Sequence, residues 1–160
     1  MLKFAFLGVW HGHASMHVKE AAARPEEFEL VGMYDVDAEV ISRNQEKWKE
    51  HGLEIPLFES VEDLLNSEAA AVVIEGHVYQ NLDYVEQALN AGKHVLMEKP
   101  MAMTVEEAQQ MALLARKRDL RLMVGHMWRF DREFQAVREV VTTGEIGEIV
   151  KVKSYGIHEN

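Results

Sequence analysis

The triplet Glu98-Lys99-Pro100 combines an acid, a base and a rigid imino acid directly after a short apolar run, residues 95–97. The apolar run has the length and composition of a buried strand. Charged groups at the carboxyl end of a strand in an α/β sheet lie in the crevice where such sheets bind ligands. An ammonium group in that crevice is a candidate proton donor, so Lys99 is the first candidate for catalysis. The competing interpretation is an ordinary strand-to-helix loop with a surface ion pair.

Three histidines, His11, His13 and His17, follow the first apolar run of the chain. A His-x-His pair after a first strand is typical of several metal-dependent hydrolases, and His13 and His17 share one helical face at i, i+4. Three imidazoles could hold zinc and leave a fourth position open. Such hydrolases need a barrel of at least ~200 residues, which 160 residues cannot form. We therefore expect no metal here, and we expect His17 to pack within the fold or to face solvent.

The loop that carries these histidines partly matches the dinucleotide fingerprint G-x-G-x-x-G. Gly8 occupies the first glycine position, but Trp10 stands at the second, His13 at the third, and Gly12 is offset by one residue. If this loop binds a dinucleotide, the donors would be backbone N–H groups at the start of the following helix, helped by the side chains of His11 and His13.

Asp35 follows the second apolar run at the distance from Gly8 that a strand-loop-helix-strand nucleotide-binding unit requires. A carboxylate there accepts hydrogen bonds from adenosine ribose hydroxyls and repels a 2′-phosphate, so we expect NAD rather than NADP. Asp37 stands directly before the next helix and is the better candidate for an N-cap.

Composition restricts the class of protein. An apolar share of 48% with 28% charged residues is that of an ordinary soluble globular protein, and no apolar run approaches the ~18–20 residues of a membrane span. The N-terminus lacks the pattern of a secretory signal, so we expect a cytoplasmic protein with no membrane partner. A net charge of −10 argues against nucleic-acid binding, and the absence of cysteine excludes disulfides and thiolate chemistry.

Apolar runs and amphipathic stretches alternate along most of the chain. This pattern predicts an α/β fold, a Rossmann-like doubly wound parallel sheet wrapped by helices. The expected strands are residues 2–7, 30–34, 56–58 at an edge, 70–74, 95–97 and 120–124. The expected helices are residues 14–24, 38–51, 61–66, 79–90 and 105–118, with Ser60 and Thr104 as N-caps. A further helix over residues 130–143 and a half-buried antiparallel strand over residues 149–155 are expected to follow.

Residues 91–115, AGKHVLMEKPMAMTVEEAQQMALLA, resemble the signature of the Gfo/Idh/MocA family of NAD(P)-dependent oxidoreductases. The resemblance implies that Lys99 lies beside the nicotinamide and the substrate, and that the Lys99-Pro100 bond is cis. Family members are roughly twice this length, and residues 124–152 resemble their passage into a second α/β domain. We therefore expect a Rossmann domain over residues 1–125, and over residues 126–160 the connecting helix and first strand of a substrate or oligomerisation domain that is otherwise absent.

The same resemblance extends the candidate cofactor site beyond the first loop. Gly76-His77 replaces a common Thr-Pro pair and Asn81 replaces a histidine, so these positions belong to the cofactor cleft with altered contacts. Glu75 is either a ribose or structural ligand or a solvent-exposed loop acid. Glu98 is expected to orient Lys99 or to bind near the nicotinamide ribose, and Pro100 completes the cofactor-binding triplet.

Trp128 and Arg129 match an aromatic-then-arginine segment that borders the nicotinamide end of the cleft in the family. Arg132 stands where the family usually has proline, so the local turn differs. The alternative for Trp128 is a packing residue between domains.

The resemblance implies hydride transfer between NAD and a polyol, sugar or related hydroxyl compound, with Lys99 assisting proton transfer. Family members also place a histidine, often with an aspartate, on a helix of the second domain, which has no counterpart here. We therefore expect this polypeptide to bind dinucleotide with little or no turnover, and to form a homo-oligomer by pairing residues 149–155 with another copy. The alternatives are a non-catalytic dinucleotide-binding module and, less favoured, a metal-dependent hydrolase.

Overall fold

The computed structural model describes residues 1–50 and 52–155. Contacts between Cα atoms divide the chain into two units, Met1–Gly125 and His126–Asn160, which are described separately. Among the residues described, there is no helix with the length and apolar character that crossing a membrane requires.

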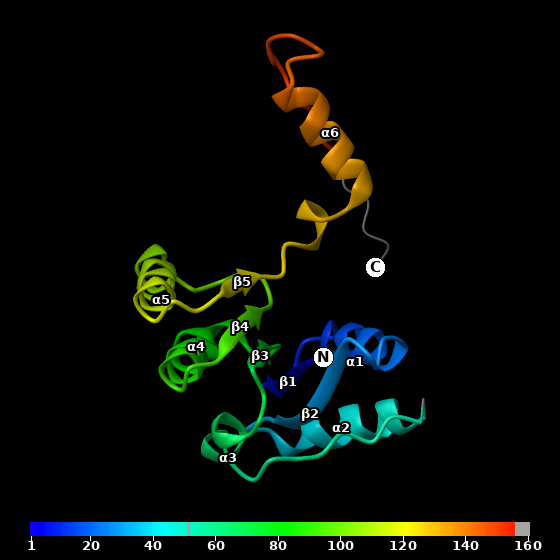
Figure 1. Cartoon of the computed structure of the whole chain (residues 1–160), viewed down its shortest axis with the longest axis vertical. Coiled ribbons are helices and arrows are strands. Elements are labelled where there is room, and N and C mark those ends of the chain that lie inside the picture. The colour runs from blue at the N-terminus through cyan, green and yellow to red at the C-terminus, as the bar shows by residue number, and fades with distance from the viewer. Residues whose placement is uncertain (51, 156–160) are drawn as a thin grey trace. The chain divides into compact units, whose positions relative to one another are not determined.

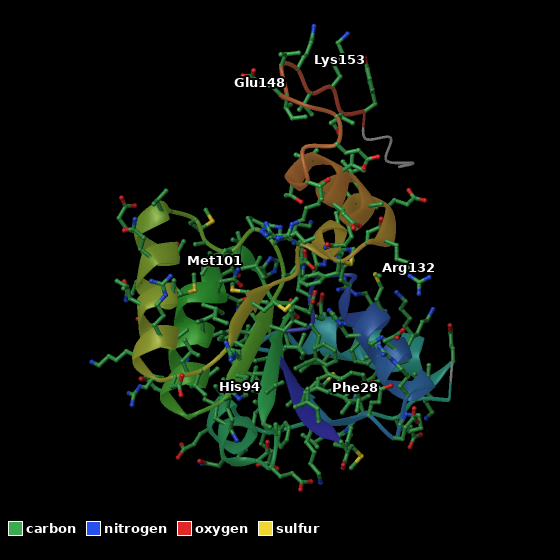
Figure 2. All side chains as sticks on the ribbon, turned by 45° about the horizontal axis from the view of Figure 1, so that its top comes forward. Phe28, His94, Met101, Arg132, Glu148 and Lys153 are labelled. Atoms are coloured by element: carbon green, nitrogen blue, oxygen red, sulfur yellow. The ribbon has the colours of Figure 1, made fainter. Side chains whose placement is uncertain are left out.

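The first unit contains one sheet of five parallel strands (Figure 1). In chain order the strands are β1 (Leu2–Leu7), β2 (Phe28–Tyr34), β3 (Ala71–Ile74), β4 (His94–Met97) and β5 (Leu122–Val124), and their spatial order is β2-β1-β3-β4-β5. The direction of winding reverses between β1 and β3, which is where open α/β sheets bind ligands. Figure 2 shows Phe28 and His94, the first residues of β2 and β4, at one edge of the sheet, and Met101 toward the opposite, carboxyl edge. The predicted Rossmann-like fold is confirmed.

Five α-helices of this unit cover the two faces of the sheet. They are α1 (Ala14–Ala23), α2 (Ala38–Lys49), α3 (Val61–Asn66), α4 (Asn81–Asn90) and α5 (Val105–Lys117). On one face Phe4 and Phe6 pack with buried residues of α1 and α2, and on the other Ala5 and Leu7 pack with buried residues of α3, α4 and α5. Since successive residues of a strand point to opposite faces, this alternation in β1 places apolar side chains in both halves of the core.

The expected helix caps are present. Asp37 accepts hydrogen bonds from the N–H groups of Glu39 and Val40, and Ser60 accepts one from Asp63. Thr104 and Glu107 form a reciprocal capping box at the start of α5. The predicted end of α2 at residue 51 lies outside the described residues.

Two expected strands are wrong. Residues 56–58 form only an isolated bridge between Leu57 and Met33, because Pro56 has no N–H group to extend the ladder.

The start of one helix also differs from the expectation. The helix expected from residue 79 begins at Asn81, after a 3₁₀ turn, η1 (Val78–Gln80).

The other wrong strand is the one expected over residues 149–155. These residues form no strand in the described part of the second unit. Val150 is 91% exposed and Val152 is 78% exposed, so the alternating pattern is not half-buried. The preceding helix, α6 (Arg132–Thr142), starts two residues later than expected because Asp131 caps it by accepting from the N–H groups of Glu133 and Phe134.

Candidate functional site

The turn after β1 crosses the turn after β3 with almost no space between them. Gly8 has φ of +84°, and a Cβ added to it would lie 2.7 Å from the Cα of Gly76. The N–H of Gly8 donates to the carbonyl of Tyr34 (2.8 Å), and its carbonyl accepts from the N–H of Glu75 (3.2 Å). Glycine at position 8 is therefore required both by the backbone conformation and by the close approach of a second loop.

Buried polar side chains below this turn fix its path. One carboxylate oxygen of Asp35 accepts from the N–H of Val9 (2.7 Å), and the other accepts from the N–H of Asp37 (3.0 Å). The amide of Asn44, on α2, donates to the carbonyl of Val9 (2.6 Å). Asp35 thus holds the loop with one lone pair of each oxygen, and the remaining lone pairs are available for other donors. Sequence reasoning missed Asn44, whose only signal is its place between Val40 and Trp48 on the inward face of α2.

The top of the loop offers backbone donors. Within the described residues, the N–H groups of Trp10 and Gly12 have no hydrogen-bond partner in the protein. A Cβ added to Gly12 would meet nothing within 4 Å, so the space above it is open. Free N–H groups beside open space at the start of α1 suit an anionic group.

A cavity of about 300 Å³ lies beside this loop, at the carboxyl ends of β3 and β4. Most of its lining consists of residues that the sequence had singled out: Trp10, His11, Gly76, His77, Asn81, Glu98, Lys99 and Pro100, together with Val78 and Tyr79. Gly8, Gly12, His13, Asp35 and Glu75 are not part of its lining. Trp128 and Arg129 belong to the second unit, in η2 (Met127–Arg129), where the Trp128 ring packs on Phe134.

An aromatic stack forms one wall of the cavity. The ring centroids of Trp10 and His77 are 4.1 Å apart, and those of His77 and Tyr79 are 5.2 Å apart with the rings nearly parallel. The bulky residue at the second glycine position therefore turns outward to pack on the β3 loop. Tyr79 was not predicted, because contact between two loops depends on the tertiary fold.

Glu98 and Lys99 lie at the end of β4 as the sequence indicated. The carboxylate of Glu98 accepts from the backbone N–H of Lys99 (2.9 Å), and the same oxygen is 3.6 Å from the Lys99 Nζ. The Lys99-Pro100 peptide bond is cis. Asn81 is buried and donates to the carbonyls of Pro100 and Met101 (3.2 Å each), so its amide holds the loop after the lysine.

The three histidines face two buried carboxylates. His13 Nδ1 lies 2.7 Å from Glu98, His11 Nδ1 lies 3.5 Å from Glu75 Oε2, and His17 Nε2 lies 3.2 Å from Glu75 Oε1. Glu75 is 1% exposed, which excludes the interpretation of a solvent-exposed loop acid. Burial acts to raise the pKa of Glu98, but hydrogen bonds from His13 and the Lys99 N–H outweigh it, and the pKa is lowered from its ordinary 4.5.

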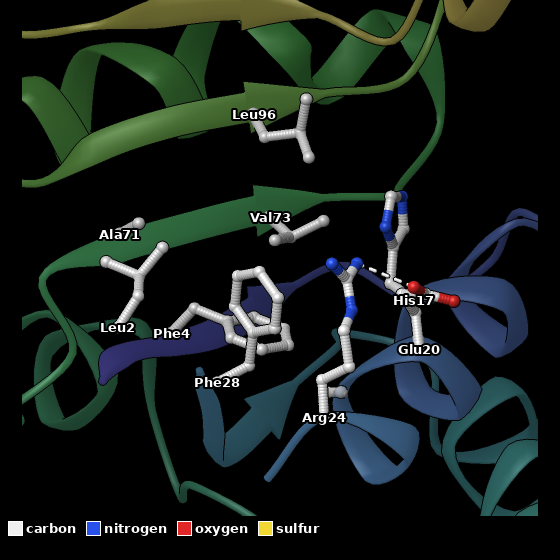
Figure 3. A pocket seen from close by; sticks show the side chains of 10 residues that line it. Leu2, Phe4, His17, Glu20, Arg24, Phe28, Ala71, Val73 and Leu96 are labelled. Atoms are coloured by element: carbon white, nitrogen blue, oxygen red, sulfur yellow. Dashed lines mark ion pairs between the residues drawn. The ribbon is translucent and has the colours of Figure 1, made fainter. Parts of the chain in front are cut away.

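A second cavity, of about 230 Å³, has a different character (Figure 3). His17 and the ion pair of Arg24 with Glu20 lie at one side of it, and the rest of its lining is apolar, including Phe4, Val73 and Leu96. The charges of Arg24 and Glu20 cancel each other, and few other polar side chains line this cavity. The first cavity, which Glu98 and Lys99 line, is therefore the better candidate for a reaction site.

A parallel sheet with a glycine turn at its switch point, an acid ending the second strand and open donors at the first helix defines a dinucleotide-binding domain of Rossmann type. The chain belongs to the Gfo/Idh/MocA oxidoreductase family, whose sequence model, described as an oxidoreductase family with an NAD-binding Rossmann fold, matches residues 2–126.

Several known proteins are similar to this chain. An uncharacterized oxidoreductase of Schizosaccharomyces pombe is 32% identical over 155 residues, which is 96% of this chain and 41% of the relative. The inositol 2-dehydrogenase of Salmonella typhimurium is 30% identical over 152 residues, 91% of this chain and 43% of the relative. The crystal structure of scyllo-inositol dehydrogenase from Lactobacillus casei, with bound NAD(H) and scyllo-inositol, matches with a TM-score of 0.78 and 27% identity, covering 92% of this chain and 43% of that one. This chain thus spans about two fifths of the length of these relatives.

Proposed function

We propose that the chain binds NAD across the carboxyl edge of its sheet and belongs to an enzyme that transfers a hydride between NAD and a polyol, sugar or related hydroxyl compound. The observation that carries the proposal is the position of Lys99, which reaches the same cavity as the loop that follows the glycine turn. The nicotinamide, when bound, supplies the hydride chemistry. The names of the inositol dehydrogenases among the relatives support a polyol as the substrate class.

The residues of this chain would have separate roles in that site. The N–H groups of Trp10 and Gly12 would bind the pyrophosphate, since both are unpaired within the described residues and the space above Gly12 is open. The remaining lone pairs of Asp35 would accept from ribose hydroxyls, and its charge favours NAD over NADP. Glu98 would orient the Lys99 ammonium group, which would move a proton to or from the substrate oxygen.

The proposed NAD site is tested by measuring NAD affinity of the parent and of a variant at Gly12 by isothermal titration calorimetry, with EDTA present. Gly12→Val should lower NAD affinity at least about tenfold, because the side chain fills the space proposed for the pyrophosphate. Position 12 has no neighbour within 4 Å of a Cβ, so the variant should keep the thermal stability of the parent. No NAD binding by the parent, or equal affinity in the folded Gly12→Val variant, would refute the proposal.

The same titration of a Lys99→Met variant distinguishes the hypothesis of an enzyme from that of a non-catalytic dinucleotide-binding module. If Lys99 serves proton transfer, NAD affinity should change by less than about threefold, since the ammonium group is half-exposed and contributes little to ground-state binding. Loss of tenfold or more would favour the binding module. In this polypeptide we expect binding without appreciable turnover, because the chain spans only two fifths of its relatives.

We also propose that the second unit mediates self-association. Val150, Val152 and Tyr155 are strongly exposed apolar residues within the described part of that unit. Light scattering across a concentration series should show a species larger than a monomer, and replacement of Val150 and Val152 by Ser should shift it toward the monomer. A monomer at high concentration would contradict this expectation.

A further inference from the structure

Two buried carboxylates at the ends of β3 and β4 lack sufficient positive charge around them. Glu75 is 1% exposed and Glu98 is 7% exposed. Within the part of the chain that the structure describes, Lys99 forms an ion pair with Glu98, and the basic side chains within 4 Å of the Glu75 carboxylate are His11 and His17. Glu75 Oε2 is buried and has no hydrogen-bond partner within the residues that the structure describes. A buried carboxylate oxygen without a donor is destabilising, so this group needs a cation or a donor that the protein itself does not supply.

Potential metal ligands surround this position. His11, His13 and Glu98 each offer one ligand atom, and these three atoms lie within 4.8 Å of one another. Tetrahedral zinc with bond lengths of ~2.0–2.2 Å separates its ligand atoms by roughly 3.3–3.5 Å, so side-chain movements of about 1 Å would complete the geometry. The rings of His11 and His13 already meet edge to face, with centroids 4.5 Å apart.

We propose that His11, His13 and Glu98 bind a divalent transition metal of the zinc class, beside the buried carboxylate of Glu75. Two imidazoles and a carboxylate select zinc, cobalt or nickel over magnesium or calcium, which prefer oxygen ligands. Glu75 Oε2 lies 3.5 Å from His11 Nδ1, so a metal held near that nitrogen would also balance the charge of the buried Glu75 carboxylate. His11 and Glu98 also line the 300 Å³ cavity, so a fourth ligand could enter from it.

This ligand set differs from the one that the histidine spacing suggests. The pattern His11-x-His13-x-x-x-His17 points to three histidines on one metal, whereas the structure turns His17 toward Glu75 and brings Glu98 from β4 into its place. A metal here therefore needs no hydrolase barrel, because its third ligand, Glu98, directly follows β4 of the same Rossmann sheet. The site does not depend on dinucleotide binding.

The test is a metal titration of the tag-free 160-residue chain after EDTA treatment, without NAD. Zinc is titrated in competition with a chromophoric chelator, and cobalt is followed by its visible absorption. We expect one equivalent of metal and a rise in the melting temperature with added zinc. His13→Gln and Glu98→Gln should each weaken binding about 100-fold or more, and Glu75→Gln about tenfold or more, because it removes a buried negative charge beside the metal. His94→Gln, at the amino end of β4 where the His94 ring accepts from the N–H of Arg121, should leave affinity unchanged.

Each other outcome overturns the proposal. A folded parent that takes up no stoichiometric metal would show that the two carboxylates are accommodated without a metal. If binding survives in both His13→Gln and Glu98→Gln, or falls equally in His94→Gln, the metal lies elsewhere. If a ligand variant fails to fold, the cobalt spectrum of the parent decides, since a tetrahedral site absorbs strongly and an aqueous-like one does not. Because the NAD titration contains EDTA, failure of either proposal is visible without the other.

Discussion

Gly8→Ala is expected to lower the free energy of unfolding by about 2–5 kcal/mol. The left-handed conformation at Gly8 costs a residue with a Cβ about 1–2 kcal/mol, and forcing extra volume into a packed site adds about 1–3 kcal/mol. The new Cβ would lie 2.7 Å from the Cα and 2.8 Å from the N of Gly76. Both are backbone atoms, so neither can rotate away as a flexible side chain would. The β1 and β3 loops would have to separate, and NAD affinity should fall with stability.

Gly92→Ala is the matched control for this effect. Gly92 has φ of +77°, close to the +84° of Gly8, but a Cβ added there would meet nothing within 4 Å. This variant should lose only the conformational cost of about 1–2 kcal/mol. Urea unfolding of both variants and the parent measures the difference. Equal losses in the two variants would show that the close approach of Gly76 to Gly8 has no energetic weight.

The sheet could be predicted because its signals are local. Apolar runs such as Leu2–Leu7 and His94–Met97 alternate with helices whose caps are chemically recognisable. The two strands that failed depend on a partner instead. Residues 56–58 have strand-like side chains but only one bridge to β2, and residues 149–155 alternate in polarity without a hydrogen-bonded neighbour among the described residues. Periodicity shows which side chains would share a face, but it cannot supply the second strand.

The site residues fall into the same two groups: those whose position is set locally and those whose position depends on a distant part of the chain. Glu98 and Lys99 were predictable because their position at a strand end fixes where their side chains emerge. The contacts of Glu75 with His11 and His17 were not predictable, because they join the loop after β3 to the β1 loop and to α1 across 58 to 64 positions of sequence. The stack of Trp10 on His77 has the same origin. The departure of Trp10 from the glycine fingerprint becomes understandable only when the neighbouring loop is seen to accommodate it.

The second large effect is expected from Trp48→Ala, which should lower the free energy of unfolding by about 3–5 kcal/mol, the range for removing a buried aromatic side chain. Trp48 is 1% exposed, its ring stacks on Phe6 of β1, and its indole N–H donates to the hydroxyl of Ser15 in the first turn of α1 (3.0 Å). The substitution therefore removes core volume and also the hydrogen bond that joins α2 to α1, the helix that follows the β1 loop.

Trp48→Phe distinguishes these two contributions. Phenylalanine keeps most of the apolar contact with Phe6 but leaves the buried Ser15 hydroxyl without its donor, a loss of about 1–3 kcal/mol. Urea unfolding should therefore place Trp48→Phe between the parent and Trp48→Ala. Equal stability of the two variants would mean that the hydrogen bond to Ser15, and not the packed ring, accounts for the effect. The stability of the core and the position of the loop would then depend on a single polar contact between α1 and α2.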